Sequence, residues 1–171
     1  MSKEPIKRTM TVTAVERPAR KLLLLRSVRA TDYFSFCAET GCGWEEAFNR
    51  IPQRLDAAAL LTLPENMIKP GTGNTAAGIE VPMDYNKLIP AGCDMLVLPP
   101  CTMLYFQGAS FQEESDFGEA INILWEEMDA YNPAQHGWQY APELAPYFNF
   151  GASAAQGAKM ARPARKIGLH G

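Results

Sequence analysis

The order strand, helix, strand, strand can be read twice along this chain, and that order restricts the folds it can adopt. In the first half, the leucine run within residues 19–28 predicts a strand, and Asp32 offers an N-cap for the helix that follows. A second short helix is predicted over residues 44–51, because its apolar residues recur at helical spacing. Residues 57–63 and 75–82 then predict the two strands of a hairpin, since a turn cluster rich in proline and glycine separates them.

The second half follows the same order. Residues 94–98 and 101–107 predict strands that two prolines separate. A helix is predicted next, because apolar residues step by four and three along one face: Phe117, Ile121, Leu124, Met128 and Tyr131. Residues 145–150 and 157–167 predict the last two strands.

A module repeated in this way pairs its strands into one curved antiparallel sheet with both helices on a single face. We therefore predict an α+β fold of duplicated strand-helix-strand-strand modules, with pseudo-repeats at about residues 17–90 and 91–167. Residues 17–171 form a single domain in this interpretation. Residues 1–16 form a flexible N-terminal tail, because the start of the chain is polar and charged.

Composition excludes several classes of protein. Hydrophobic residues make up 47% of the 171 residues, which is enough for a packed core. The net charge of -3 comes without a basic stripe, so we expect no direct nucleic-acid partner. No run approaches the ~18 apolar residues of a spanning helix and the N-terminus has no apolar signal core, so we expect no membrane partner and a cytoplasmic location.

The sequence also lacks the usual motifs of metal and cofactor sites. The four cysteines have spacings that match no common zinc pattern, so we expect no metal and reduced, mostly buried thiols. A cysteine that lines a cavity and reacts with an electrophilic ligand remains an open alternative. No phosphate-binding glycine motif is present, and we expect no cofactor.

Two features suggest a site for a small molecule. Glu80 alternates with Ile79 and Val81 along a predicted strand, so its carboxylate points to the opposite face, either as a general acid or base or as a solvent-facing side chain. Aromatic side chains lie on or beside many predicted elements, and such side chains line pockets for planar ligands when they do not fill the core. Along residues 101–107, Met103 and Tyr105 share one face, and periodicity alone does not say whether that face meets the helices or a cavity.

Nine short motifs occur in a characteristic order between about residues 17 and 167. They are Arg26-Ser27-Val28-Arg29-Ala30-Thr31-Asp32-Tyr33-Phe34, Gly41-Cys42-Gly43-Trp44, Leu63-Pro64, Gly78-Ile79-Glu80-Val81-Pro82, Ile89-Pro90-Ala91-Gly92, Phe106-Gln107-Gly108, Ala120-Ile121 with Trp125, Tyr131-Asn132-Pro133 and Arg162-Pro163-Ala164-Arg165. In this combination the chain resembles the GyrI-like small-molecule-binding domain, the effector-binding domain of AraC-type bacterial transcription regulators.

The resemblance implies a ligand cleft between the two halves, walled by aromatic and apolar side chains with a carboxylate, for planar and often cationic molecules. Carried onto this chain, it places Glu80 at the acidic position and Tyr33, Trp44, Tyr105 and Trp125 at aromatic positions of the family. The chain departs from the family in its last strand, which offers Lys159 and Arg162 where a carboxylate is common. This departure weakens the case for a cationic ligand and opens the case for a neutral or anionic one.

Three hypotheses for the function follow. The first is a cytoplasmic binding domain for a small hydrophobic or aromatic ligand, acting as an effector sensor or a sequestering protein, with a separate DNA-binding regulator as partner because no helix-turn-helix remains unassigned. The second is a hydrolase that opens cyclopropane-bearing genotoxins with Glu80 as its catalytic carboxylate. The third is an interaction domain that uses the sheet surface. The predicted ligand-binding residues are Tyr33, Trp44, Glu80, Met103, Tyr105, Trp125 and Phe148.

Overall fold

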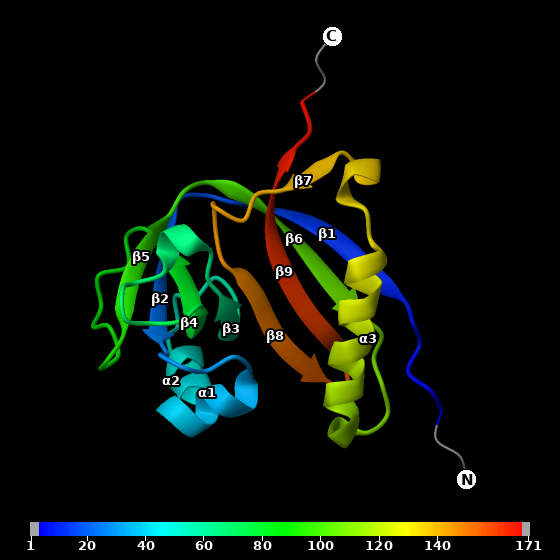
Figure 1. Ribbon diagram of the computed structural model, residues 1–171, viewed down its shortest axis with the longest axis horizontal. Coiled ribbons are helices and arrows are strands. Elements are labelled where there is room, and N and C mark those ends of the chain that lie inside the picture. Colours follow the sequence, from blue (N-terminus) through cyan, green and yellow to red (C-terminus); the bar gives the residue numbers. More distant parts are fainter. Residues whose placement is uncertain (1–3, 169–171) are drawn as a thin grey trace.

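A computed structural model describes residues 4–168 of the chain (Figure 1). Within these residues the strands are β1 (Met10–Arg17), β2 (Arg20–Arg26), β3 (Ala59–Thr62), β4 (Thr75–Pro82), β5 (Asp94–Leu98), β6 (Cys101–Gly108), β7 (Trp138–Tyr140), β8 (Tyr147–Ser153) and β9 (Gly157–Lys166). The α-helices are α1 (Tyr33–Thr40), α2 (Trp44–Asn49) and α3 (Phe117–Ala130), with 3-10 turns at Glu65–Met67, Glu114–Asp116 and Pro133–His136.

All the strands join one antiparallel sheet in the order β1-β6-β9-β8-β3-β4-β2-β5, with β7 paired to β9. The first module is β2, the helices α1 and α2, β3 and β4, and the second is β6, α3, β8 and β9. In each module the first and second strands flank the third, and the two modules meet where β3 pairs with β8. The predicted α+β fold of duplicated modules is therefore confirmed.

Local sequence explains where the helices begin and end. Asp32 accepts a hydrogen bond from the Ser35 backbone N–H at 2.8 Å, and the Ser35 hydroxyl accepts one from the Asp32 N–H at 3.1 Å, so a capping box starts α1. Gly41 ends α1 with a φ of 88°, which favours glycine. In α3, Leu124 and Met128 of the predicted apolar stripe are buried together with Ala120 and Ile123, whereas Phe117 of that stripe is 42% exposed.

The helices all cover one face of the sheet. Ile79 and Val81 of β4 pack against α1 and α2, and Met160 of β9 packs against α3. Leu60 of β3, Asn149 of β8 and Met160 lie side by side in the register and therefore point to the same face. Leu60 packs in the apolar cluster beneath α1 and α2, and Met160 packs in the cluster beneath α3. Because these two side chains share a face of the sheet, all three helices cover that face (Figure 1).

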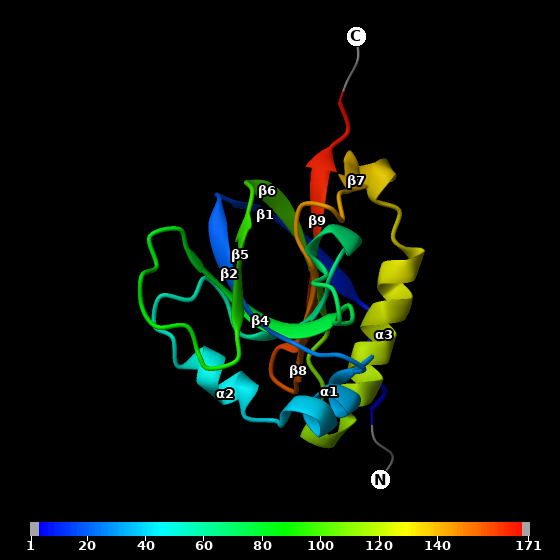
Figure 2. The ribbon, with the colours of Figure 1, turned by 60° about the vertical axis from the view of Figure 1, so that its left-hand side comes forward.

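The opposite face packs against itself. Leu22 and Leu24 of β2 form one apolar cluster with Met103 of β6 and Ala161 of β9, although these strands belong to different modules. The sheet is strongly curved (Figure 2), which brings residues of distant strands together on its helix-free side. Glu80 lies on this face too, directly opposite Leu22.

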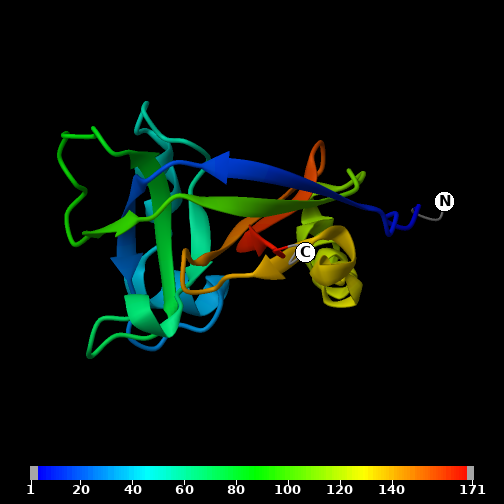
Figure 3. The ribbon, with the colours of Figure 1, turned by 90° about the horizontal axis from the view of Figure 1, so that it is seen from above.

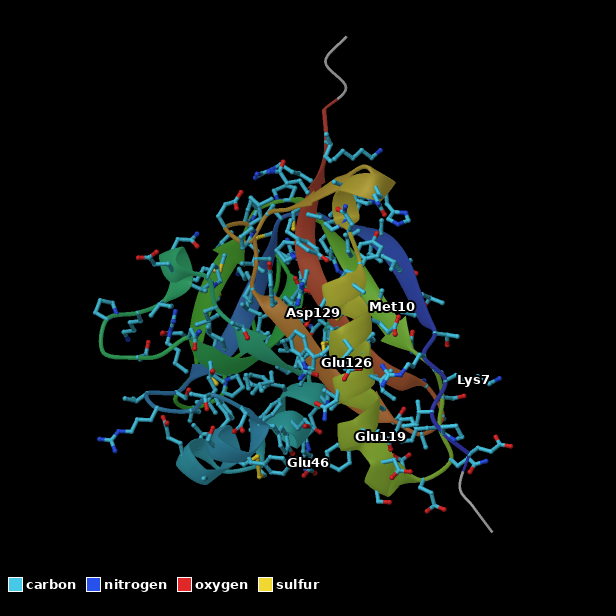
Figure 4. All side chains as sticks on the ribbon, turned by 45° about the vertical axis from the view of Figure 1, so that its right-hand side comes forward. Lys7, Met10, Glu46, Glu119, Glu126 and Asp129 are labelled. Atoms are coloured by element: carbon cyan, nitrogen blue, oxygen red, sulfur yellow. A yellow bond between two sulfur atoms is a disulfide. The ribbon has the colours of Figure 1, made fainter. Side chains whose placement is uncertain are left out.

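The expectation of a flexible tail over residues 1–16 is wrong for its second half. β1 pairs with β6 along its whole length, from Met10 opposite Gly108 to Arg17 opposite Cys101, and it runs beside β6 between the two halves (Figure 3). The segment before it lies along α3 (Figure 4), where Arg8 pairs with Glu126 at 2.5 Å. Residues 1–3 of the expected tail lie outside the described residues.

The expectation of reduced thiols is wrong for two of the four cysteines. Cys37 of α1 forms a disulfide with Cys42 in the turn before α2, while Cys93 and Cys101 are free. The bridge ties together the two short helices of the first module. No helix in the described part of the chain is long and apolar enough to cross a membrane.

Candidate functional site

A cavity of about 690 Å³ opens on the helix-covered face, between α1 and α2 on one side and α3 on the other. Its floor comes from β3, β8 and β9, the strands on either side of the join between the modules. Two rows of side chains cross this floor in the register. One row is Leu60, Asn149 and Met160, and in the next Thr62 lies opposite Tyr147, whose ring contacts Arg162.

The wall from the first module is aromatic. Tyr33 and Phe34 stand in the first turn of α1, and Trp44 stands at the start of α2. The Tyr33 and Phe34 ring centroids are 5.6 Å apart and those of Tyr33 and Trp44 are 6.2 Å apart, both edge to face. Phe34 is 69% exposed, so its ring is available for a ligand rather than used by the core. Asp32 and Glu45, both exposed, add carboxylates on this side.

The wall from the second module is one side of α3. Ile121, Trp125 and Met128 line it, with Phe117 at its start. Trp125 is 37% exposed, whereas its neighbour Leu124 is buried against the sheet on another side of the same helix. The helical pattern therefore divides the side chains of α3 between the core and the cavity.

Arg162 is the one cationic side chain that lines the cavity among residues 4–168. Its guanidinium carbon lies 4.7 Å from the ring centroid of Tyr147, 5.3 Å from that of Tyr140 and 5.6 Å from that of Trp125. Aromatic rings attract a cation at these distances and hold its plane in a fixed orientation. No carboxylate in the described chain lies within 4.0 Å of the guanidinium, and its buried Nε has no hydrogen-bond partner there.

A second donor at the cavity is also unsatisfied. Trp44 is 6% exposed, and its indole N–H has no hydrogen-bond partner among the described residues. A buried donor without a partner costs free energy.

The structure brings together only some of the predicted ligand-binding residues. Tyr33, Trp44 and Trp125 line the cavity. Phe148 borders it, but its side chain belongs to the apolar cluster on the opposite face, where it stacks on Phe150 at 5.7 Å. Alternation along β8 explains the difference, because Tyr147 and Asn149 on either side of Phe148 face the cavity.

Glu80, Met103 and Tyr105 do not line the cavity. Met103 is fully buried in the cluster of the helix-free face, and Tyr105 packs against the same cluster. They share a face as the alternation predicted, but it is the face without helices. The placement of all three residues in the ligand site is therefore corrected.

Glu80 is neither in the cavity nor facing solvent. Its side chain is 2% exposed, and its carboxylate pairs with Arg20, which is fully buried, at 2.5 Å. Arg17 lies on the other side of the carboxylate, with its Nε at 3.9 Å. Arg20 also donates to the Pro99 carbonyl at 2.8 Å, so the pair links β2, β4 and the turn before β6. This arrangement is that of a structural ion pair.

The remaining charged groups of the helix-free face are paired in the same way. Lys159 donates to both carboxylate oxygens of Asp56 at 3.0 Å, with its ammonium 4.5 Å from the Phe150 ring centroid. Arg17 donates to the Tyr105 hydroxyl at 2.9 Å. Burial, together with the nearby Asp56 carboxylate, raises the pKa of Tyr105 above its usual value, so the phenol stays neutral. The two basic residues noted in the last strand thus differ, because Lys159 has a counter-ion and Arg162 faces the cavity.

Several cavity residues were not among the predicted ones. Phe34, Ile121, Tyr147 and Arg162 contribute side chains to its walls or floor. The sequence placed Tyr147 and Arg162 in predicted strands of the second module. Which face of the sheet their side chains occupy could be known only from the register of β8 against β3 and β9. Among residues 4–168, no group of three or more His, Cys, Asp or Glu side chains is arranged to hold a metal ion.

Comparison with known proteins identifies the fold. No family model matches the sequence, and no curated protein matches it either. The C-terminal domain of EcmrR superposes with a TM-score of 0.51 at 14% identity, over 92% of this chain and 99% of that domain. The chain therefore has the fold of that domain.

Two further structures match with lower TM-scores. EcmrR in a complex with DNA gives 0.47 at 13% identity, over 92% of this chain, which spans 58% of that protein's length. An integron cassette protein from the mobile metagenome of Vibrio cholerae gives 0.43 at 16% identity, over 90% of this chain and 95% of that one.

Proposed function

We propose that this protein is a small-molecule-binding domain of the GyrI-like, effector-binding type, which holds a planar hydrophobic ligand in the cavity between its two modules. The observation that carries the proposal is an open cavity of about 690 Å³ with aromatic walls from both modules. Pockets of this volume, mostly apolar with a few polar groups, are typical of sites for drug-sized molecules.

The geometry favours a flat ligand. Phe34 and Tyr33 on one wall and Trp125 on the other expose ring surface toward the same space. Burying a planar molecule between such walls supplies micromolar affinity, about 8 kcal/mol, without a covalent step. The same site serves a sensor of an effector or a protein that sequesters its ligand.

A separate DNA-binding regulator as partner, in the cytoplasm, completes this proposal. The shared fold with the C-terminal domain of EcmrR supports a role as one domain of a regulatory assembly. The multidrug specificity and the AraC-type partner implied by the sequence resemblance belong to the same proposal.

No observation favours the hydrolase alternative. That alternative requires the Glu80 carboxylate at the ligand, whereas Glu80 is paired with Arg20 on the opposite face of the sheet. The interaction-domain alternative likewise gains no support, since the aromatic side chains gather around a cavity rather than over a flat surface.

Tryptophan fluorescence tests the proposal, because two of the three tryptophans line the cavity. Trp138→Phe removes the tryptophan outside it, so the remaining signal comes from Trp44 and Trp125. We expect saturable quenching of this variant by planar aromatic molecules that are neutral, anionic or cationic. Trp125→Phe should reduce the amplitude. A panel that produces no saturable quenching up to millimolar concentration would refute the proposal.

A further inference from the structure

We propose that the ligand of this cavity is a planar aromatic monoanion, and that Arg162 binds its carboxylate. This inference rests on the proposed function, because it concerns the same cavity. It adds the charge of the ligand and the residue that recognises it.

The first argument is the position of the guanidinium. Arg162 projects from β9 onto the cavity floor, and the rings of Trp125, Tyr140 and Tyr147 surround it at 4.7 to 5.6 Å. These rings restrain the side chain before any ligand arrives, so little conformational entropy remains to be lost on binding. The plane of a guanidinium presents paired N–H donors that match the two oxygens of a carboxylate.

The second argument is the missing counter-ion. A guanidinium stays protonated in proteins, and a partly buried charge without a partner is unfavourable. Two other basic residues of β9 have a counter-ion, since Lys159 pairs with Asp56 and Arg165 pairs with Glu143. Arg162 has no carboxylate within 4.0 Å in residues 4–168, and its Nε is buried without a partner.

The neighbouring tyrosine does not supply the missing charge. Burial raises the pKa of Tyr140, and the Arg162 cation opposes that rise without cancelling it. The phenol is therefore neutral at physiological pH. Asp32 and Glu45 also line the cavity, but no carboxylate of residues 4–168 lies within 4.0 Å of the guanidinium, so a ligand anion is the remaining source of a counter-charge beside Arg162.

The carboxylates of the first module define the direction of binding. Asp32 and Glu45 lie at the wall formed by α1 and α2, and Asp32 is held by Ser35. An anion is repelled there and attracted at Arg162, so the charged end of the ligand lies toward β9. The aromatic body then extends toward Tyr33 and Trp44 on the opposite wall.

Among residues 4–168 the cavity lining offers one cation, Arg162, with the carboxylates of Asp32 and Glu45 on the wall of the first module, and a single cation favours a ligand with a single negative charge. A phosphate monoester carries close to two charges at neutral pH and needs several donors. One planar guanidinium instead matches a carboxylate, which it binds with two parallel hydrogen bonds.

The test uses three probes of the same shape and different charge: 2-naphthoate, 2-naphthamide and 2-naphthylmethylammonium. Calorimetry and tryptophan quenching at low salt give their dissociation constants for the full chain. We expect the naphthoate to bind about tenfold or more tightly than the amide, as a charge-assisted pair requires. The ammonium should bind most weakly of the three.

Variants locate the effect. Arg162→Gln should weaken naphthoate binding about tenfold or more and leave the amide unchanged, and Arg162→Lys should keep part of the preference. Arg165→Gln is the matched control, because Arg165 lies on the same strand but is exposed and does not line the cavity. It should leave the affinities for all three probes unchanged.

The outcomes separate the two proposals. If the wild-type chain binds the amide or the ammonium saturably with an affinity equal to or higher than that for the naphthoate, the proposal of an anionic ligand is overturned and the binding function stands. A naphthoate preference that survives in Arg162→Gln overturns the role of Arg162. Absence of binding by all three probes overturns both the inference and the proposed function.

Discussion

Replacing Glu80 by glutamine should destabilise the fold strongly while leaving the ligand site intact. The side chain is 2% exposed, and its carboxylate contacts the fully buried Arg20 at 2.5 Å. The substitution keeps the shape of the side chain and removes its charge. Arg20 then has only neutral polar partners, which are the amide oxygen of the glutamine, the Pro99 carbonyl at 2.8 Å and the sulfur of Cys101.

The expected loss is about 3–5 kcal/mol, the usual cost of breaking a buried ion pair from one side. Two conditions place this variant near the lower limit, because glutamine still accepts a hydrogen bond and the Pro99 carbonyl remains. Even about 3 kcal/mol is a large part of the 5–15 kcal/mol that is typical for the stability of a domain.

Urea unfolding measures the effect, and a double-mutant cycle with Arg20→Met separates the pair from its surroundings. The double variant should lose less free energy than the sum of the two single variants, since neither charge is left alone. Glu46→Gln is the control, because Glu46 pairs with Arg50 on an exposed helix surface. Its midpoint should change far less.

The same variant decides whether Glu80 takes part in binding. Because Glu80 lies on the face away from the cavity, Glu80→Gln should bind aromatic probes with the affinity of the wild type at temperatures where it is folded. Additive losses in the cycle, or a midpoint like that of Glu46→Gln, would refute the ion-pair argument. Loss of binding in a folded Glu80→Gln would refute the assignment of faces.

Two further predictions concern the backbone around the site. Glu39 accepts hydrogen bonds from the backbone N–H groups of residues 28–30, and those bonds lower its pKa. The stability that Glu39 adds is therefore present above its ordinary pKa and is lost as the pH falls through the lowered pKa. Glu39→Gln should make the urea midpoint depend less on pH between 7 and 3, and an unchanged dependence would contradict this argument. Gly157 has a φ of 81°, and a Cβ added to it would lie 2.5 Å from the Gly108 carbonyl oxygen, whereas a Cβ added to Gly137, with a φ of 82°, would meet open space. Gly157→Ala should therefore lose at least about 1 kcal/mol more than Gly137→Ala in the same assay, and equal losses would show that the close contact is relieved.

The fold could be predicted from the sequence where the pattern is local. The helix of residues 117–130 follows from apolar spacing, and the hairpin of β3 and β4 follows from the turn cluster between its strands. β1 was missed although Met10, Val12 and Ala14 alternate with threonines, because the charged residues before them suggested a tail. Its pairing with β6 joins residues about ninety positions apart, which no local pattern reveals.

The site was predictable only in part, for a reason that lies in the sheet. Alternation groups Met103 with Tyr105 and Glu80 with Gly78, but the identity of the helix-covered face depends on how each strand is placed in the sheet. The helical residues were easier to place, since Tyr33, Trp44 and Trp125 stand on helices that cover one face. Arg20, the partner of Glu80, gave no signal because a basic residue at the start of a strand is ordinarily exposed.

The position of the cavity follows from the fold, and its chemistry follows from a few side chains. In each module the helices pack over the strands of their own module, so the join between β3 and β8 lies between α2 and α3. The floor there includes Leu60, Thr62, Tyr147, Asn149, Met160 and Arg162, and of these only Arg162 carries a charge. Replacing that one residue therefore changes the charge of the floor without changing the shape of the sheet, which makes the ligand's charge a property of Arg162 rather than of the fold.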